Sequence, residues 1–383
     1  MAAAVVATLV CVAAADARPP LWGFHAGWFW YCPDAATGDA PIVAASAECP
    51  DGEAPFSAEE QVAGVARAGA ETIRIQAAWS QRRPPDDADG VADGDEHGYN
   101  FAPLDILYRA AREAGLRPVL MLMGVPEWAR DPGWRERCPA ALPCGYPPSR
   151  ERLASFRAWV EAVMRRYPDA LAIEVWNEPN VPRFFAVEGG EGERARRYAE
   201  LLHRVHRARV ATGFRGAIVS AGLSPAPTAV GFLRRLYRHS RNAWFDGIGL
   251  HPYPEGRPFV VRMNARIDAV LRVRRRNHHR GAKLWLTELG VRGAREGYPR
   301  RSVAPRRQGP VIERLYRAAA RRPVAAVHFY TFAELPHEGP YLGGFGVVTS
   351  TLEPKPAYCH LQVSLGGVRP GAGDPCGGWW WRP

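Results

Sequence analysis

Two glutamates in this sequence each stand at the end of a short apolar run. Glu178 follows the run LAIEVW at residues 171–176, and Glu288 closes the run LWLTE at residues 284–288. Short apolar runs containing β-branched residues are typical of buried parallel strands. Pro179 has no N–H for a strand ladder, so the first run must end at Glu178. Each run therefore leaves a carboxylate at the C-terminal edge of a strand, where parallel α/β folds form their active sites.

Two carboxylates facing one pocket are what glycoside hydrolysis requires, because one protonates the leaving oxygen while the other attacks the anomeric carbon. A single strand-end glutamate is ambiguous, since it could equally cap the helix that follows. If the two runs are strands four and seven of an eight-stranded barrel, however, Glu178 and Glu288 would face each other across the mouth of the barrel. The neighbouring Asn177 adds an amide that donates and accepts hydrogen bonds, which suits a substrate dense in hydroxyl groups.

Further polar and aromatic side chains fall at or just past the ends of the other predicted strands. These residues are His25, Arg74, Gln76, Pro126, Trp128, His251, Tyr253, His328, Tyr330 and Thr331. Trp128, Trp79 and Tyr330 are candidate surfaces for stacking on a sugar ring, with Trp128 the best of them. Packing in the core is at least as good an interpretation of each aromatic taken alone.

The elements that must position these residues follow from the alternation of two patterns. Apolar, β-rich runs occur at residues 21–26, 72–76, 118–123, 171–178, 217–221, 245–251, 283–288 and 324–330. Helical patterns occupy residues 57–68, 103–114, 150–166, 193–211, 228–239, 261–276, 309–321 and 356–365. The first helix opens with the capping box Ser57-x-x-Glu60, and the second closes at Gly115. An eightfold alternation in a chain of this length predicts the α/β class and a single (β/α)8 TIM barrel as the catalytic domain.

These residues resemble a known clan. The sequence is similar to the retaining glycoside hydrolases with (β/α)8 barrels, which include cellulase-type endoglucanases, mannanases, β-xylosidases and α-L-iduronidases. The Asn-Glu pair that ends strand four of that clan matches Asn177-Glu178, and its strand-seven glutamate matches Glu288. Its strand-two arginine matches Arg74, and its His-x-Tyr after strand six matches the HPY at residues 251–253.

Two shorter stretches extend the resemblance, which covers residues 21 to 365. They are GVPEWA at residues 124–129 and the closing FG and PKP motifs at residues 345–346 and 354–356. One departure concerns the end of strand eight, where many members of the clan place a sugar-stacking tryptophan and this chain has Tyr330. The departure leaves open the platform of the −1 subsite and the family within the clan.

The resemblance implies a role for each matched residue. Glu178 would be the acid/base and Glu288 the nucleophile of a double displacement on a β-linked oligo- or polysaccharide. The implied substrate-binding residues are Arg74, Trp128, Asn177, His251, Tyr253 and Tyr330. Neither a cofactor nor a metal ion is implied. Arg74 and the Tyr253 hydroxyl would favour the charged form of Glu288, while burial beside that charge would keep Glu178 protonated.

The basic composition does not predict a nucleic-acid partner. The chain has 383 residues and a net charge of +11, but all except two of its 50 basic residues are arginine, and they are scattered along the chain. The scatter is typical of codon bias, and the densest runs lack the interleaved aromatics of a nucleic-acid platform. We expect the protein to be a monomer and its partner to be a carbohydrate substrate.

The N-terminal residues predict export. Residues 2–15 are almost wholly apolar and small, and the Ala-Asp-Ala at residues 15–17 has the form of a cleavage site, although no basic residue precedes the apolar stretch. The predicted organisation is a signal peptide at 1–17, a catalytic domain at 18–365 and a tail at 366–383. We therefore expect a secreted, extracellular protein without a membrane span. Its six remaining cysteines fall into close pairs suited to disulfides rather than zinc, namely Cys32 with Cys49, Cys138 with Cys144, and Cys359 with Cys376.

Several interpretations stay open from the sequence. The acidic segment at residues 84–99 could ligate calcium or could be a solvated loop. The three tryptophans at residues 379–381 could stack on sugars or fold back onto the domain. The main alternative to an enzyme is a carbohydrate-binding pseudoenzyme on the same barrel, which the presence of both glutamates disfavours.

Overall fold

The computed structural model describes residues 18–26, 57–79, 98–131, 145–225, 228–293, 302–334, 343–371 and 373–377. Some predictions lie outside these residues. They are the signal peptide, two of the three cysteine pairs, residues 84–97 of the acidic segment and the tryptophans of the tail. The boundaries predicted for the three segments of the chain likewise stay predictions.

Eight parallel strands close into a barrel, as the sequence predicts. Its order is β1-β10-β7-β6-β5-β4-β3-β2, so β10 is the eighth barrel strand. The barrel strands are β1 (Leu21–His25), β2 (Thr72–Ala78), β3 (Arg117–Met123), β4 (Ala172–Asn177), β5 (Ala217–Gly222), β6 (Gly247–Leu250), β7 (Lys283–Leu289) and β10 (Val324–Phe329). The short β8 (Arg292–Gly293) and β9 (Ser302–Val303) form a separate parallel pair beyond β7, which the sequence analysis did not predict.

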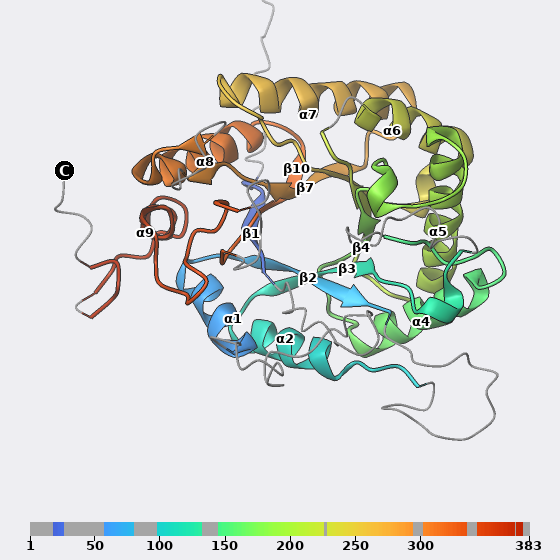
Figure 1. The fold of residues 1–383 in the computed structure, drawn as a ribbon, viewed down its shortest axis with the longest axis horizontal. Helices are drawn as coiled ribbons and strands as arrows, with labels where there is room; N and C mark the ends of the chain where they lie inside the picture. The colour runs from blue at the N-terminus through green and yellow to red at the C-terminus, as the bar shows by residue number, and fades with distance from the viewer. Residues whose placement is uncertain are drawn as a thin grey trace, which may run out of the picture.

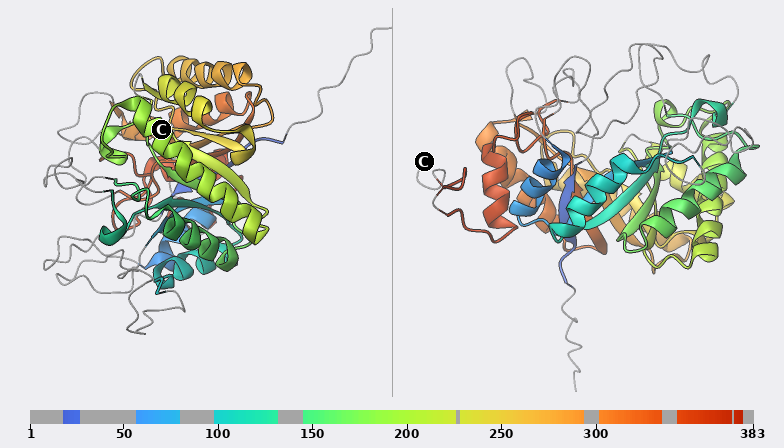
Figure 2. Two further views of the ribbon diagram at one scale, coloured as in Figure 1. Left: turned by 90° about the vertical axis from the view of Figure 1, so that its right-hand side faces the viewer. Right: turned by 90° about the horizontal axis from the view of Figure 1, so that it is seen from below.

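Helices form a ring around these strands (Figure 1) and run alongside them when the barrel is seen from the side (Figure 2). The described helices are α1 (Ala58–Arg67), α2 (Ala102–Glu113), α4 (Leu153–Arg166), α5 (Glu191–Thr212), α6 (Thr228–His239), α7 (Phe259–Arg276), α8 (Pro305–Ala319) and α9 (Pro356–Ser364). The predicted TIM barrel is confirmed. No helix within these described ranges is long and apolar enough to cross a membrane.

Local signals set the ends of several helices. Ser57 and Glu60 form the predicted capping box of α1 through two reciprocal hydrogen bonds. Gly213 ends α5 in the left-handed conformation that favours glycine. Helix α8 begins at Pro305 rather than at the predicted residue 309, because Pro305 occupies the first turn, where its missing N–H has no helical acceptor to lose.

The barrel interior changes character along its axis. At the N-terminal end, inward-facing apolar side chains from five strands form a small cluster: Val119, Ala172, Val219, Trp285 and Ala326. Towards the C-terminal edge the interior holds fully buried polar groups, among them Arg74 and Glu174. Because buried charges must be paired, this end of the barrel is where polar contacts concentrate.

The end of β4 departs from regular strand geometry. Trp176 has a φ of 76° and Glu178 a φ of 43°, values that are unfavourable for residues with side chains. The Trp176 indole N–H donates to the Phe184 carbonyl at 2.7 Å, and its ring packs edge-on against Phe185. The strand ends at Asn177, one residue before the predicted end. Because the bend takes Trp176 out of the regular alternation, Asn177 and Glu178 can both reach polar groups of the barrel mouth.

Candidate active site

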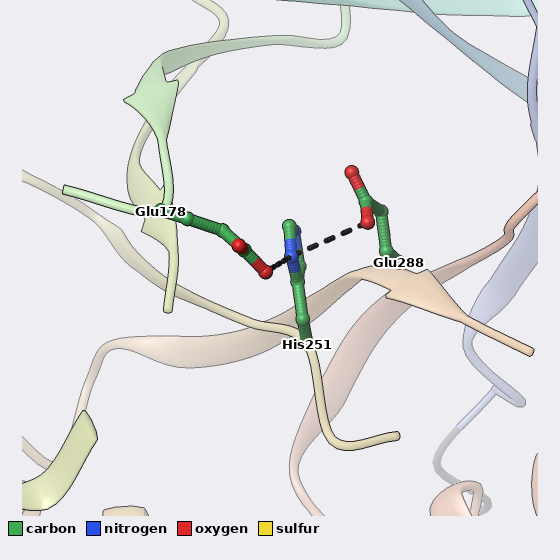
Figure 3. Close-up of side chains that lie close together, drawn as sticks. All are labelled: Glu178, His251 and Glu288. Carbon is green, nitrogen blue, oxygen red and sulfur yellow. Dashed lines mark hydrogen bonds and ion pairs between the residues drawn. The ribbon is translucent and has the colours of Figure 1, made fainter. Parts of the chain in front are cut away.

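Glu178, His251 and Glu288 form the centre of the site, with the imidazole between the two carboxylates (Figure 3). The Nδ1 atom of His251 lies 2.8 Å from Oε1 of Glu178 and 3.4 Å from Oε2 of Glu288. Carboxylate oxygens of the two glutamates lie within 4.8 Å of each other. The structure therefore brings together the two glutamates that the sequence placed on opposite strands. We call these three residues the acid–base cluster.

His251 is held at both ring nitrogens. Its Nε2 lies 3.1 Å from the Thr287 hydroxyl, and its side chain is fully buried. Burial alone would lower the pKa of His251, but the Glu288 charge and the hydrogen bond with Glu178 outweigh it, so that the pKa is raised. Since Nδ1 faces two carboxylates, it carries a proton and donates to Glu178.

Glu288 has a donor on each of its oxygens. Arg74 donates from Nη1 to Oε1 at 2.8 Å, and the Tyr253 hydroxyl donates to Oε2 at 2.9 Å. Burial and the Glu288 charge raise the pKa of Tyr253, so its hydroxyl stays a donor at neutral pH. A cation and a hydroxyl donor both stabilise the ionised form of a carboxylate.

Arg74 is completely buried and connects the site to the strands beneath it. It donates from Nε to Glu174 at 2.6 Å and from Nη2 to Oδ1 of Asn177 at 2.9 Å. Burial would lower the pKa of Arg74, but the charges of Glu174 and Glu288 raise it, so the guanidinium stays charged. Because Arg74 occupies the oxygen of Asn177, the amide N–H groups of Asn177 remain available as donors.

Two neutral histidines flank Arg74. His25 accepts from Arg74 through Nδ1 at 3.0 Å, and burial followed by the Arg74 charge lowers its pKa. The Thr72 hydroxyl donates to the carbonyl of Arg117, so the contact of 3.2 Å between Thr72 and His328 has Nε2 of His328 as its donor. Burial lowers the pKa of His328 to about 3, with the Arg74 charge as a second cause.

The predicted stacking residues occupy different surroundings. Tyr330 is buried and stacks on His25 with ring centroids 5.7 Å apart, while Tyr253 and Phe345 pack against it edge-on. Tyr330 thus lies next to the residue that holds Glu288. Trp128 is half-buried in the short 3-10 helix η1 (Glu127–Ala129) that follows β3, where Trp79 packs against it and Arg152 lies over its ring. These contacts do not connect Trp128 to the acid–base cluster, so its role as a sugar platform stays a prediction.

The atoms of the acid–base cluster are close enough together to surround one cation. Each of them, however, is already engaged by another member of the cluster or by Arg74 and Tyr253. This arrangement suits proton transfer between a carboxylic acid and a carboxylate, and we do not assign a metal to it. The prediction that the protein uses no metal or cofactor stays a prediction.

Two residues of the site were not predicted from the sequence. Glu174 lies in the middle of β4 and pairs with Arg74, and Thr287 precedes Glu288 and contacts His251. A signal for Glu174 was present, since a charged residue inside an apolar strand needs a partner and Arg74 has the same setting on β2. Thr287 carries no comparable signal, because threonine is common in strands.

Three solved structures with a similar fold are described as a glycoside hydrolase, a β-xylosidase and a β-mannosidase. A family 39 glycoside hydrolase from Bacteroides cellulosilyticus WH2 matches with a TM-score of 0.59 and 18% identity, over 81% of this chain and 61% of that one. A monomeric β-xylosidase from Caulobacter crescentus CB15 has a TM-score of 0.58 and 18% identity, over 79% and 63% of the two chains. An exo-β-1,4-mannosidase from Opitutaceae bacterium strain TAV5 has a TM-score of 0.58 and 14% identity, over 90% and 59%.

The chain spans about three fifths of the length of these solved structures. No protein-family model matches the sequence, and no curated protein matches it. At identities below one fifth the likeness shows the fold, which is the barrel of the clan that the sequence resembles.

Proposed function

We propose that this protein is a glycoside hydrolase that cleaves β-linked oligo- or polysaccharides with retention of configuration. The observation that carries the proposal is the acid–base cluster, in which oxygens of Glu178 and Glu288 lie within 4.8 Å of each other on opposite sides of His251. Retaining glycosidases hold their two carboxyl groups ~5–5.5 Å apart, whereas inverting enzymes need ~6.5–9.5 Å to admit a water. Because the nearest oxygens of the two carboxylates lie within 4.8 Å of each other and His251 stands between them, little room is left for an attacking water, which supports direct attack by one carboxylate.

The surroundings of the two glutamates support different roles. Glu288 accepts from Arg74 and Tyr253, which favour its charged form, and so it is the nucleophile. Glu178 has neither a cation nor a tyrosine hydroxyl among its described hydrogen bonds, and it lies beside the negative Glu288. It is therefore the residue better able to hold a proton for the leaving oxygen.

The first step forms a covalent sugar ester. The Glu288 oxygen attacks the anomeric carbon while Glu178 gives its proton to the departing oxygen. Because His251 donates to Oε1 of Glu178, the acidic proton resides on the other oxygen, away from the imidazole. Asn177 has its amide N–H groups available for the sugar 2-hydroxyl, a contact that strengthens in the transition state.

The second step releases the sugar. Once Glu288 is esterified it carries no charge, so Glu178 loses its proton more readily and acts as a base towards water. The His251 N–H then stabilises the carboxylate of Glu178. Water attacks the anomeric carbon from the side that the leaving group vacated, and two successive inversions give net retention.

The substrate-binding residues are Arg74, Trp128, Asn177, His251, Tyr253 and Tyr330. We propose a secreted monomer that uses no cofactor and binds neither nucleic acid nor a membrane. The similar solved structures support a carbohydrate substrate, since two of them are described as a β-xylosidase and a β-mannosidase.

A screen of aryl β-glycosides and of plant, fungal and bacterial polysaccharides tests the proposed function. Hydrolysis by the wild-type protein is expected, and Glu288→Gln should abolish it without changing the thermal unfolding midpoint by more than a few degrees. The amide fills the same volume but cannot serve as the nucleophile. A folded wild-type protein that binds these sugars without hydrolysing any of them would instead support the carbohydrate-binding pseudoenzyme.

A further inference from the structure

Glu174 is a completely buried carboxylate beneath the candidate active site. Its Oε2 accepts from Nε of Arg74 at 2.6 Å, and its Oε1 accepts from Nη2 of Arg74 at 3.3 Å. The backbone N–H of Gly222 donates to Oε1 at 2.9 Å. The carboxylate thus forms a two-point ion pair that is shielded from water, and it cannot itself touch a substrate bound above Arg74.

The second acid on Arg74 changes the net charge of the site. Arg74 bears one positive charge and contacts two glutamates, Glu174 and Glu288, through separate nitrogens. With Arg74 and Glu288 alone, the pair would be neutral. With Glu174 included, the three groups together carry one negative charge, and Glu288 is the member with a partly exposed side chain.

We propose that Glu174 is a positioning residue that offsets the charge of Arg74, so that Arg74 orients Glu288 without neutralising it. The proposal rests on the proposed function for its catalytic consequence, but the charge offset itself is a property of the folded chain. A net negative charge beneath the anomeric carbon stabilises an oxocarbenium-like transition state and keeps Glu288 a strong nucleophile.

No other ionisable group among the residues that the structure describes duplicates this charge. Among the described residues, Tyr198 on α5 and the pair His251 and Tyr253 after β6 interact with Glu174, Glu178 or Glu288, whereas His25 on β1 and His328 on β10 interact with Arg74 on β2. The two tyrosines, His25 and His328 are neutral near pH 7. Within the part of the chain that the structure describes, Arg74 is the permanent cation that pairs with the two buried carboxylates, which is why removing Glu174 should be felt at both Glu178 and Glu288.

The test compares Glu174→Gln, which removes the charge in the same volume, with Glu174→Asp, which keeps the charge. Carboxyl carbons are followed by ¹³C NMR during a pH titration of the full chain, with resonances identified by their loss in Glu288→Gln and Glu178→Gln. Glu174→Gln should lower the titration midpoints of Glu178 and Glu288 by about one pH unit, the order expected for removing a charge several ångströms away. Both limbs of the profile of kcat/KM against pH should move down with them.

A purely structural role gives the opposite sign. If Glu174 only held Arg74 in place, its loss would free Arg74 from Glu288, and the Glu288 midpoint would rise, as it should in Arg74→Gln. A rise in Glu174→Gln, or no change, would overturn the proposal. Should Glu174→Gln fail to fold, Glu174→Asp decides: the proposal requires unmoved midpoints even where kcat falls, and a shift of one unit contradicts it.

These readouts separate the inference from the proposed function. The carboxyl midpoints are measured without substrate, so they report the charge offset even if the wild-type protein hydrolyses no glycoside. If the wild-type protein hydrolyses glycosides but the midpoints are unshifted in Glu174→Gln, the proposed function would stand and the proposed role of Glu174 would be wrong.

Discussion

The two central glutamates differ in what surrounds each carboxylate. Glu288 accepts from a guanidinium and a tyrosine hydroxyl, whereas Glu178 shares an imidazole N–H. A donor that is always charged favours an ion, while a titratable donor permits a carboxyl group to change its protonation state during a reaction. This asymmetry between two chemically identical side chains is the basis for assigning the nucleophile and the acid/base.

Removing the acid/base should slow the two classes of substrate unequally. In Glu178→Ala, hydrolysis of glycosides with poor leaving groups should fall by about 10²–10⁴, because those leaving groups need a proton. Aryl glycosides with acidic phenols should lose far less in the first step, and azide should restore part of their turnover by replacing water. Steady-state rates on a matched pair of substrates, with and without azide, measure both effects. Equal losses on both substrates would show that Glu178 is not the acid.

Because His328 is buried in its neutral form, we expect the folded protein to lose stability in acid. The pKa of His328 is about 3 in the folded protein against 6.5 for an unperturbed histidine. Between these values the unfolded chain binds a proton that the folded chain does not, so the free energy of unfolding falls as pH falls through this range. The slope from this one group is about 1.4 kcal/mol per pH unit.

His328→Gln keeps a donor for Thr72 but cannot titrate. Urea unfolding of the wild-type protein and of this variant at pH 6.5, 5.5 and 4.5 measures the free energy of unfolding. This free energy should fall less steeply with falling pH in the variant, and the difference in slope should correspond to at most one bound proton. Parallel declines would mean that His328 is charged in the folded protein.

The sequence predicted the site residues that lie at the ends of strands, but it did not predict Glu174, which lies inside a strand. Asn177, Glu178 and Glu288 each follow an apolar run, which places them at an edge. Glu174 stands inside such a run, and its partner Arg74 is 100 residues away. Nothing local in either segment fixes that pairing, because it depends on the register between strands.

At the scale of elements, the end of β5 lies directly against His251, which follows β6, and against Thr287 on β7. A Cβ atom on Gly222, the last residue of β5, would lie 1.9 Å from Nε2 of His251 and 2.5 Å from the Thr287 hydroxyl. The glycine is required by this close approach rather than by its backbone conformation. The end of β5 therefore determines how deeply the imidazole sits between the two glutamates.

Gly222→Ala should displace His251 and lower kcat/KM by about 10²-fold, because misplacing a catalytic group by one ångström has that order of effect. Overpacking should also cost about 1–3 kcal/mol of stability. Gly281→Ala is the matched control, since nothing lies within 4 Å of a Cβ at that position ahead of β7. Its activity should equal that of the wild type. Full activity in Gly222→Ala would contradict the packing described here.

Element types were easier to predict than element ends. All eight barrel strands and all eight predicted helices are present in the structure, since their apolar periodicities are strong. The ends depend on particular contacts. Strand β4 ends at Asn177, directly after Trp176 turns to donate to the Phe184 carbonyl, and α8 begins at Pro305 rather than at the predicted residue 309.

At the scale of the whole molecule, barrel closure brings together groups that are remote in sequence. Arg74, Glu178, His251 and Glu288 come from β2, the end of β4, the end of β6 and β7, and each contacts at least one of the others. The disulfide between Cys359 and Cys376, which joins α9 to the segment after it, is confirmed. The fold class follows from the order of the elements, whereas the distances across the mouth come only from closing the barrel.

The stereochemistry of the first-formed sugar tests the central claim most directly. Proton NMR of a β-glycoside during hydrolysis shows the anomer of the product before mutarotation mixes the two forms. Attack by Glu288 followed by water predicts that the β-anomer appears first and the α-anomer only later. An α-anomer as the first product would mean that water attacks directly, which would contradict both the nucleophilic role of Glu288 and the double displacement.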